Sequence, residues 1–381
     1  MKTNSSASSS TPRHKKAVLH SFHLKKMQSK VCSPDDVTVL IKIFGVLLLL
    51  LVLVISVATY QQIWSSHEDR ISYRPPPANL MHNMSDEQLF RHALSVSRMK
   101  DKYRSGGSRK IAFMFLTAQR MHLTPLWDQY FEGHEGLYSI YIHSEQGDYA
   151  LNSVFYRRQI PSRKVSEKSS FSAIDAARRL LANALLDLSN ERFVLLSETC
   201  IPLYNYSFTY DYLINSKLSF VEAFDEPGPG ARGRYSPKLA PELSLSQWRK
   251  GAPWFEVHRT VAVAIVNDTE LYAKFDRLRD EMNLQHEHYF PSLLTLRAER
   301  LIANRSVTWE SWKSGAFEPE IFELEDTTRR LLEKINMEKK CVYDDKPSTV
   351  CFLFARRFGQ SSLWPLLKLA SSLGFASHES S

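Results

Sequence analysis

The chain has 381 residues, with 49 Lys and Arg against 41 Asp and Glu, and a formal net charge of +8. At 43% hydrophobic and 12% aromatic residues, its composition is that of a globular protein and excludes a disordered or collagen-like chain. An excess of basic over acidic residues can indicate a nucleic-acid-binding protein. Here residues 1–42 carry +6 of the charge, so the rest of the chain is nearly neutral and no nucleic-acid partner is expected.

An apolar run follows this basic segment. Residues 43–60, IFGVLLLLLVLVISVATY, hold no charged side chain, and about 18 apolar residues just span a bilayer core. A cleaved signal peptide is the alternative, but signal peptides have short basic regions, whereas about 40 residues precede this run. Positive charge before a span favours the cytosolic side. The sequence therefore predicts a single-pass type II membrane protein with a cytosolic tail (1–42) and a signal anchor (43–60).

Residues 61–108 are predicted to form a lumenal stem, because Pro75–Pro77 and Gly106-Gly107 are typical of a spacer. Within it, apolar residues at helical spacing predict a short helix from Ser85 to Met99. Acceptor sequons for N-glycosylation downstream of the span favour a lumenal location. They are Asn83, Asn205, Asn267 and Asn304.

Three of the four cysteines follow the span. Cys341 and Cys351 close a short loop and are predicted to form a disulfide, whereas Cys200 follows a buried strand and is predicted to be a small core residue. No CxxC motif or His/Cys cluster indicates structural zinc.

Residues 109–381 are predicted to form one α/β domain, because strand patterns alternate with helix patterns. Apolar runs at 110–119, 136–144 and 192–198 are typical of strands covered on both faces. Shorter strands are predicted at Val165 and 218–224, and helices over 172–188, 207–216 and 268–281. In a parallel, Rossmann-like sheet, ligands bind at the carboxyl ends of the strands, here 117–120, 143–148 and 197–199. No P-loop motif occurs.

The second half of the chain is rich in aromatic residues beside polar ones. Sugar rings stack their C–H faces on such aromatic side chains and bond to polar neighbours, while the alternative for each tryptophan is a place in the core. The tryptophans concerned are Trp248, Trp254, Trp309 and Trp312. For any one of them the core is the favoured interpretation.

The segments WRKGAPWFEVHR, HEHYFPSLL, NRSVTWESW and CFLFARRF together resemble the plant branch of the core-2/I-branching β-1,6-N-acetylglucosaminyltransferase-like proteins, glycosyltransferase family 14. FVLLSETCIPLYN and the type II organisation match too, and the resemblance runs from roughly residue 110 to 367. It implies a GT-A-type fold, retention in the Golgi, and inverting transfer from a UDP-sugar, with UDP-GlcNAc as the expected donor, to a glycan acceptor.

An inverting transfer needs a base for the acceptor hydroxyl and positive charge for the departing diphosphate. Many GT-A enzymes use Mn²⁺ on an Asp-x-Asp motif, which this sequence lacks. The resembling enzymes are metal-independent and use basic side chains, so no cofactor or metal is expected. The resemblance implies Glu287 as the base and Arg356 and Arg357, with Lys339 or Lys340, as the diphosphate contacts.

The resemblance also places further binding residues. His143 and Ser144 are expected to line the nucleotide pocket, and Ser169 and Ser170 to meet uridine or ribose. The expected acceptor contacts are Glu222, Arg232, Arg234, Tyr235, Trp254 and Glu256. Each of these has an ordinary loop or core alternative.

Other functions remain open at this stage. His286 and His288, at i and i+2, do not share a helix face, which disfavours a metal site. A family member without catalysis would serve as a Golgi glycan-binding or scaffold protein. A glycoside hydrolase needs two carboxylates that flank one bond, for which Glu198 and Glu287 are the candidates.

Overall fold

The computed structural model describes residues 34–69, 80–100, 108–144, 149–161, 170–314, 316, 318–337 and 340–370. The strand predicted at Val165 and the predicted contacts Ser169 and Lys339 lie outside these residues. The chain divides into two compact units, one up to Arg70 and one from Ile71 onward.

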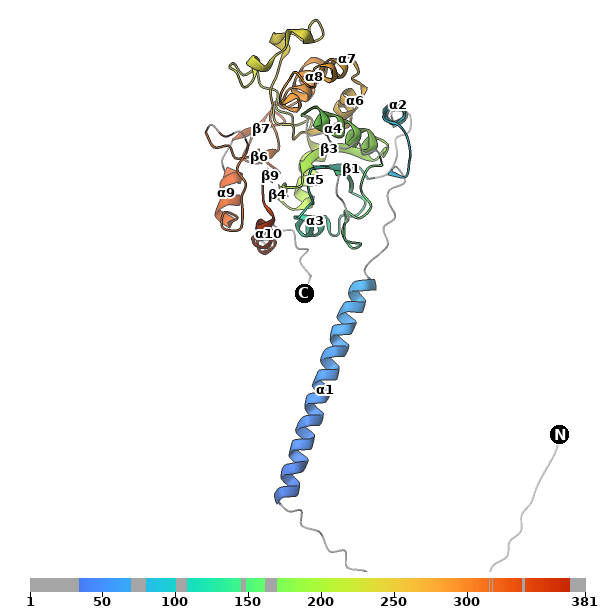
Figure 1. Cartoon of the computed structure of the whole chain (residues 1–381), viewed down its shortest axis with the longest axis vertical. Helices are drawn as coiled ribbons and strands as arrows, with labels where there is room; N and C mark the ends of the chain where they lie inside the picture. The colour runs from blue at the N-terminus through green and yellow to red at the C-terminus, as the bar shows by residue number, and fades with distance from the viewer. Residues whose placement is uncertain are drawn as a thin grey trace, which may run out of the picture. The chain divides into compact units, whose positions relative to one another are not determined.

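The described part of the first unit is one continuous helix, α1 (Pro34–Asp69; Figure 1). The window Lys42–Thr59 is long and apolar enough to cross a membrane, and its side chains are exposed, for example Phe44 and Leu49. A helix satisfies every backbone hydrogen bond within itself, which a segment in lipid requires. The predicted apolar span is therefore helical and consistent with membrane anchoring.

A four-stranded sheet of order β2-β1-β3-β5 forms the centre of the second unit. Its strands are β1 (Lys110–Thr117), β2 (Tyr138–Ser144), β3 (Asn190–Ser197) and β5 (Glu256–His258). The first three are parallel, and β5 pairs antiparallel with β3. This confirms the predicted mixed α/β domain with a parallel sheet.

Helices cover both faces of this sheet (Figure 1). Because β1 alternates its side chains, Ala112 and Met114 pack in one core, and Phe113 and Phe115 in the other. The first core includes α4 (Ser170–Leu185), α6 (Arg259–Asn267), α7 (Glu270–Arg277) and α8 (Tyr289–Ala298). The second includes α3 (Thr124–Phe131), α5 (Tyr206–Asn215), α9 (Arg329–Met337) and α10 (Leu363–Ala370). This double cover explains why the strands read as unbroken apolar runs.

Two smaller sheets complete the unit. β9 (Phe354–Arg356) lies between β4 (Ile201–Pro202) and β6 (Thr308–Glu310), and β7 (Cys341–Tyr343) pairs with β8 (Lys346–Ser348). The Cys341–Cys351 disulfide is present, with a Cα–Cα distance of 5.7 Å, and Cys200 is buried and free, so both predictions are confirmed. Short 3₁₀ helices are η2 (Arg232–Arg234), η3 (Pro237–Leu239), η4 (Leu245–Gln247), η5 (Gln285–Glu287), η6 (Glu299–Leu301) and η7 (Gln360–Ser362).

Two predicted boundaries need correction. The strand predicted at 218–224 forms only isolated bridges, from Ser219 to Ile302, Phe220 to Glu256 and Phe224 to Lys250. The helix predicted at 268–281 is limited to α7, which begins after the capping residue Thr269.

Part of the predicted stem belongs to the folded unit. The predicted helix is present as α2 (Asp86–Lys100); its residues Leu89 and Ala93 are buried in the first core, and Val96 is also buried. The Asp86 carboxylate also lies 2.9 Å from the Arg179 guanidinium. Burying one large apolar side chain stabilises a fold by about 1.5–3 kcal/mol. Residues 80–100 therefore pack as domain structure, and the stem boundary predicted at residue 108 is placed too late.

Candidate functional site

The carboxyl ends of the parallel strands β1, β2 and β3 lie at one edge of the central sheet. The chain leaves β1 for α3 in one core and leaves β2 for α4 in the other, and ligands of such sheets bind at the carboxyl ends of the strands. Thr117, His143 and Ser144 lie at this edge, and the Thr117 hydroxyl donates to the His143 carbonyl over 3.4 Å. His143 and Ser144 thus stand where a nucleotide is expected, and their nucleotide contact stays a prediction.

Glu287 ends η5, directly before α8. Its carboxylate Oε2 accepts from Arg234 Nη1 over 2.8 Å, with 18% of the Glu287 side chain and 28% of the Arg234 side chain exposed. The backbone carbonyl of Glu287 accepts from Gly251 N over 2.9 Å. The side-chain carboxylate and the backbone carbonyl of Glu287 are therefore both held by hydrogen bonds, and the carboxylate remains partly accessible to solvent.

The loop from Asp225 to Tyr235 carries Arg234 to this position. Trp248 Nε1 donates to the Ala231 carbonyl over 2.9 Å, and Tyr235 Oη donates to the Leu243 carbonyl over 2.8 Å. Arg232 instead pairs with Asp225 on the exposed side, at 2.6 and 2.7 Å. The structure brings Arg234 to Glu287, while the described contacts of Arg232 and Tyr235 stabilise the loop.

The same loop contains Gly228-x-Gly230-x-x-Gly233, the spacing of a dinucleotide-binding turn. Such a turn joins a strand to an α-helix. Here the segment leads into the three-residue η2. It therefore does not provide the helix N-terminus that binds a pyrophosphate.

Glu222 also contacts the 251–252 segment, to which Glu287 is bonded through its backbone carbonyl. Its Oε2 accepts from Ala252 N over 3.0 Å. The backbones approach so closely that a Cβ at position 251 would lie 2.2 Å from the Glu222 carbonyl oxygen, which only glycine permits. Gly251 thus packs against the backbone of Glu222 and bonds the backbone carbonyl of Glu287, two of the residues expected to function.

The parallel pairing of β6 with β9 sets Glu310 beside Arg356. The Arg356 guanidinium pairs with the Glu310 carboxylate and lies 4.3 Å from the centre of the Trp254 ring. Arg357 Nη1 lies 2.6 Å from Glu318 Oε2, and the Glu318 side chain is 74% exposed. Exposed ion pairs contribute about 0–1 kcal/mol, so an anion can displace Glu318 from Arg357.

The Glu198 carboxyl, directly after β3, interacts electrostatically with both Arg356 and Arg357. Burial raises the pKa of its carboxyl above the ordinary value, and the charges of Arg356 and Arg357 oppose that rise. The two arginines therefore lie near the carboxyl end of β3.

A pocket of about 370 Å³ adjoins these groups. Its lining residues are Glu222, Ala252, Arg305, Ser306, Thr308, Trp309, Glu310, Trp312, Cys351 and Phe352. Its lining thus includes Ala252, which follows the Gly251 that contacts Glu287, Glu222, which bonds Ala252, and Glu310, which pairs with Arg356. A volume above about 300 Å³ is in the range of small-molecule pockets. Carboxylates, a guanidinium and two indole rings in one pocket suit a carbohydrate.

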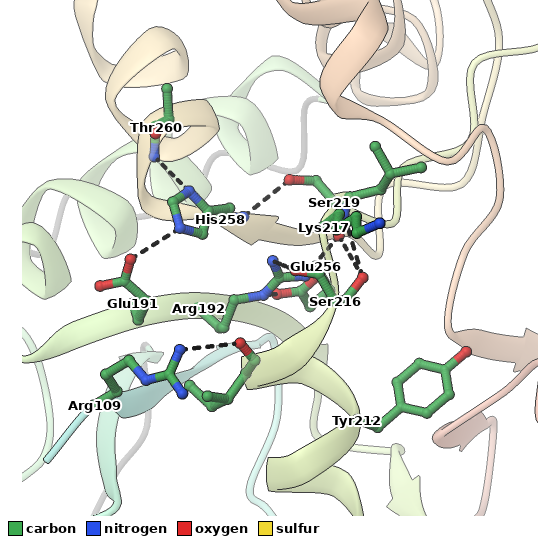
Figure 2. A network of polar contacts seen from close by, with 12 residues as sticks. Arg109, Glu191, Arg192, Tyr212, Ser216, Lys217, Ser219, Glu256, His258 and Thr260 are labelled. Carbon is green, nitrogen blue, oxygen red and sulfur yellow. Dashed lines mark hydrogen bonds and ion pairs between the residues drawn. The ribbon is translucent and has the colours of Figure 1, made fainter. Parts of the chain in front are cut away.

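One expected acceptor contact is corrected. Glu256 is fully buried, and its two oxygens each lie 2.7 Å from Arg192 nitrogens (Figure 2). Arg192 also donates to the Ser216 and Leu218 carbonyls. Burial raises the pKa of the Glu256 carboxyl, and the Arg192 guanidinium opposes the rise. The prediction that Glu256 binds the acceptor is wrong, because the side chain is a core ion pair beyond the reach of a ligand.

The tryptophans divide between the two interpretations. Trp248, Trp254 and Trp309 are buried, with 1%, 9% and 5% of each residue exposed, whereas Trp312 is 52% exposed. Trp254 also lines a second cavity of about 120 Å³ with His286 and Phe290. The core interpretation is therefore confirmed for Trp248 and wrong for Trp312, while Trp254 and Trp309 are core residues that also border cavities.

The remaining predicted residues have ordinary surroundings. Lys340 is exposed before β7, and Asn83, Asn267 and Asn304 are exposed. Asn205 caps α5 by accepting from Phe208 N, and Asn304 Oδ1 accepts from Ala223 N. Their glycosylation stays a prediction. In the part of the chain that the structure describes, no three His, Cys, Asp or Glu side chains are grouped to hold a metal ion.

Sequence reasoning did not identify Glu310 and considered Glu198 only as a hydrolase carboxylate. A signal for Glu310 was present, because it stands between Trp309 and Trp312 at the end of a short β-branched and aromatic segment.

Comparison with known proteins gives two matches. A family model described as "Branch: Core-2/I-Branching enzyme" matches residues 111–336. Over 312 residues the chain is 32% identical to the protein "Glycosyltransferase BC10" of Oryza sativa subsp. japonica, which covers 69% of this chain and 77% of that protein. The family match includes Arg234, Glu287 and β6, and it ends before Arg356 and Arg357.

Proposed function

This chain belongs to the Core-2/I-branching enzyme family of glycosyltransferases, and from this premise we propose that it transfers a sugar from a UDP-sugar to a glycan hydroxyl. We propose inversion at the anomeric carbon, no metal ion, a GT-A-type fold and UDP-GlcNAc as the donor, on the resemblance of the motifs. A glycosyltransferase of this kind has a nucleotide-sugar and an acceptor as its substrates.

The observation that carries the proposal is the position of Glu287. Its Oε2 is bonded to Arg234, and the described part of the chain forms no hydrogen bond to its Oε1. A general base must reach the proton that it removes, so Oε1 is the atom assigned to the acceptor hydroxyl. The 370 Å³ pocket, which Ala252 lines next to Gly251, is assigned to the acceptor sugar.

Arg356 and Arg357 are assigned to the departing diphosphate. Arginine binds phosphate oxygens bidentately and keeps its charge, so it stabilises the negative charge that develops on the leaving group. Glu310 and Glu318 pair with the two arginines in the structure. In the proposed reaction the diphosphate replaces the exposed Glu318 at Arg357, while Arg356 stays anchored on Glu310 and Trp254.

We propose that α1 anchors the enzyme in the Golgi membrane with the catalytic unit in the lumen. The basic residues before the span and the sequons after it support this orientation.

UDP release by the purified full-length protein tests the function. We expect acceptor-dependent release from one member of a panel of UDP-sugars, unchanged by EDTA. Glu287→Gln should lower this rate by roughly 10²–10⁴-fold, the usual contribution of a general base, and leave UDP binding intact. UDP binding without release in the wild type would support the inactive scaffold, and wild-type turnover in the variant would remove Glu287 from the mechanism.

A further inference from the structure

The chain is anchored in the protein interior on both sides of Glu287. Two positions before it, the buried Gln285 donates through Nε2 to the Phe275 carbonyl over 3.3 Å and to the Leu278 carbonyl over 2.8 Å. Two positions after it, Tyr289 begins α8 and is fully buried in the first core. Glu287 therefore lies midway between two buried side chains, although its own carboxylate is partly accessible.

The Tyr289 hydroxyl belongs to a buried network with Arg178 and Asp268. Tyr289 Oη donates to Asp268 Oδ2 over 2.8 Å and accepts from Arg178 Nη1. Arg178 Nη2 donates to the Asp268 carbonyl over 2.6 Å, and the side chains of Arg178 and Asp268 are each 3% exposed. Burial raises the pKa of the Tyr289 hydroxyl well above its ordinary value of 10, so it remains a donor at neutral pH. The network thus joins α4, the turn between α6 and α7, and the first residue of α8.

Further contacts fix the partners of the tyrosine hydroxyl. The Asp268 carboxylate accepts from Leu271 N over 3.2 Å and from Tyr272 N over 2.9 Å at the start of α7. The Arg178 guanidinium lies 4.1 Å from the centre of the Tyr272 ring. Because both charged groups are held by other partners, the hydrogen bonds to Tyr289 define where α8 begins.

Stability alone does not account for such a network. Two charges taken out of water carry a desolvation penalty that their attraction often only offsets, and packed apolar side chains in their place are often as stable. Directional hydrogen bonds provide a fixed geometry that apolar contacts do not. This geometry is set two residues from the proposed base.

We propose that Arg178 and Tyr289 are positioning residues for Glu287, which fix the start of α8 and thereby the backbone that presents the carboxylate to the acceptor hydroxyl. This inference rests on the proposed function and adds residues to its mechanism. Both side chains are buried, so they act through Glu287 and not by contact with a substrate. Arg234 holds the carboxylate itself, whereas Arg178 and Tyr289 hold the chain that carries it.

Kinetics of the full-length protein test this role. Tyr289→Phe removes one oxygen and keeps the ring, so it is the mildest change to the network. Its kcat for acceptor-dependent UDP release should fall by roughly tenfold, since small misplacements of a catalytic group cost up to about 10²-fold. The KM for the UDP-sugar should not change, because the diphosphate is assigned to Arg356 and Arg357. Arg178→Lys, which keeps a charge beside Asp268, should retain more of kcat than Arg178→Gln.

Tyr206→Phe is the matched control. Tyr206 is also a buried tyrosine, and its hydroxyl donates to the Leu137 carbonyl over 2.8 Å, but it packs in the second core. Both phenylalanine variants lose one hydrogen bond of the protein interior and should have lower melting temperatures. Only Tyr289→Phe should lower kcat when the rates are measured well below those temperatures.

A double-variant cycle with Glu287→Gln separates positioning from a general effect on the fold. Tyr289→Phe should lower the rate when Glu287 is present and leave the residual rate of the Glu287→Gln variant unchanged, because no base remains to be misplaced. Equal fold losses in both backgrounds would overturn the proposal. Wild-type kcat in Tyr289→Phe, or an equal fall in the Tyr206→Phe control, would overturn it too, and all of these leave the proposed function intact. If the wild type releases no UDP with any acceptor, the proposed function itself fails, and the positioning role with it.

Discussion

Arg234 donates to the carboxylate of Glu287 over 2.8 Å, and the two residues come from segments 53 positions apart in the chain. The loop that carries Arg234 is itself held by Trp248, so the ion pair is formed by two independently fixed backbones. Such a pair fixes the direction of the Glu287 carboxylate, and in the proposed reaction Oε1 receives the proton of the acceptor hydroxyl.

Loss of Arg234 should therefore impair catalysis more than binding. We expect Arg234→Met to lower kcat by roughly 10–100-fold, because small misplacements of a catalytic group cost up to about 10²-fold. The affinity for UDP should not change, since UDP is assigned to Arg356 and Arg357. Arg234→Lys, which keeps a donor and the charge, should recover part of kcat. Steady-state kinetics and UDP titration of the purified variants measure these effects.

Lys238→Met is the matched control for this experiment. Lys238 forms an exposed pair with Glu281 at 2.6 Å, near Arg234 in the chain but outside the candidate site. A fall in kcat of the same size in both variants would mean that the surface charge matters and that the contact with Glu287 does not.

The two C-terminal arginines should differ in their effects. Arg357→Gln should weaken UDP binding by about 10- to 100-fold, as expected for a hydrogen bond to a charged group, and leave the melting temperature unchanged, because its partner Glu318 is exposed. Arg356→Gln should weaken UDP binding and also lower the melting temperature, because Arg356 stacks on Trp254 and pairs with the largely buried Glu310. Calorimetric titration with UDP and thermal unfolding distinguish the two. Equal melting temperatures would contradict the anchoring role of Arg356.

The sequence predicted features that depend on local pattern and missed those that depend on distant partners. The buried strands, α2, and the Cys341–Cys351 bridge follow from residues close together in the chain. Glu256 and Glu287 both stand in motifs with aromatic and basic neighbours. The neighbouring sequence therefore does not show which of the two glutamates is buried and which is accessible. The difference arises from Arg192, which is 64 positions from Glu256 and buried with it, whereas Glu287 meets an arginine on an exposed loop. Pairings of this kind appear only once the sheet has formed.

The Arg192–Glu256 pair should stabilise the fold without taking part in catalysis. Glu256→Gln leaves a buried guanidinium without its counter-charge, so we expect a loss of about 3–5 kcal/mol in the free energy of unfolding. The double variant Arg192→Met with Glu256→Gln should be more stable than Glu256→Gln alone, because it removes the uncompensated charge. Urea unfolding measures both. Full stability in the single variant, or no gain in the double variant, would contradict this role.

His288 should make stability depend on pH. Burial lowers the pKa of its imidazole from 6.5 to about 4, and the charges of Arg234, Lys250 and His286 add to the effect. The ring stacks on Trp248, with centroids 4.3 Å apart, and its Nδ1 lies 3.0 Å from the Arg249 carbonyl. Because the folded state favours the neutral ring, this stabilisation is complete above pH 6.5 and is lost as the pH falls from 6.5 to about 4.

The expected loss over that window is on the order of 3 kcal/mol, since each pKa unit corresponds to about 1.4 kcal/mol. His288→Gln removes the titrating group, so it should be less stable than the wild type at pH 7 and show a flatter dependence of stability on pH. Urea midpoints at intervals between pH 4 and 7 measure both slopes. Carboxylates that titrate in the same range contribute equally to the pH dependence of both proteins, so their contribution cancels when the slopes are compared. Parallel curves would show that His288 is charged in the folded state, or that its titration is not coupled to unfolding.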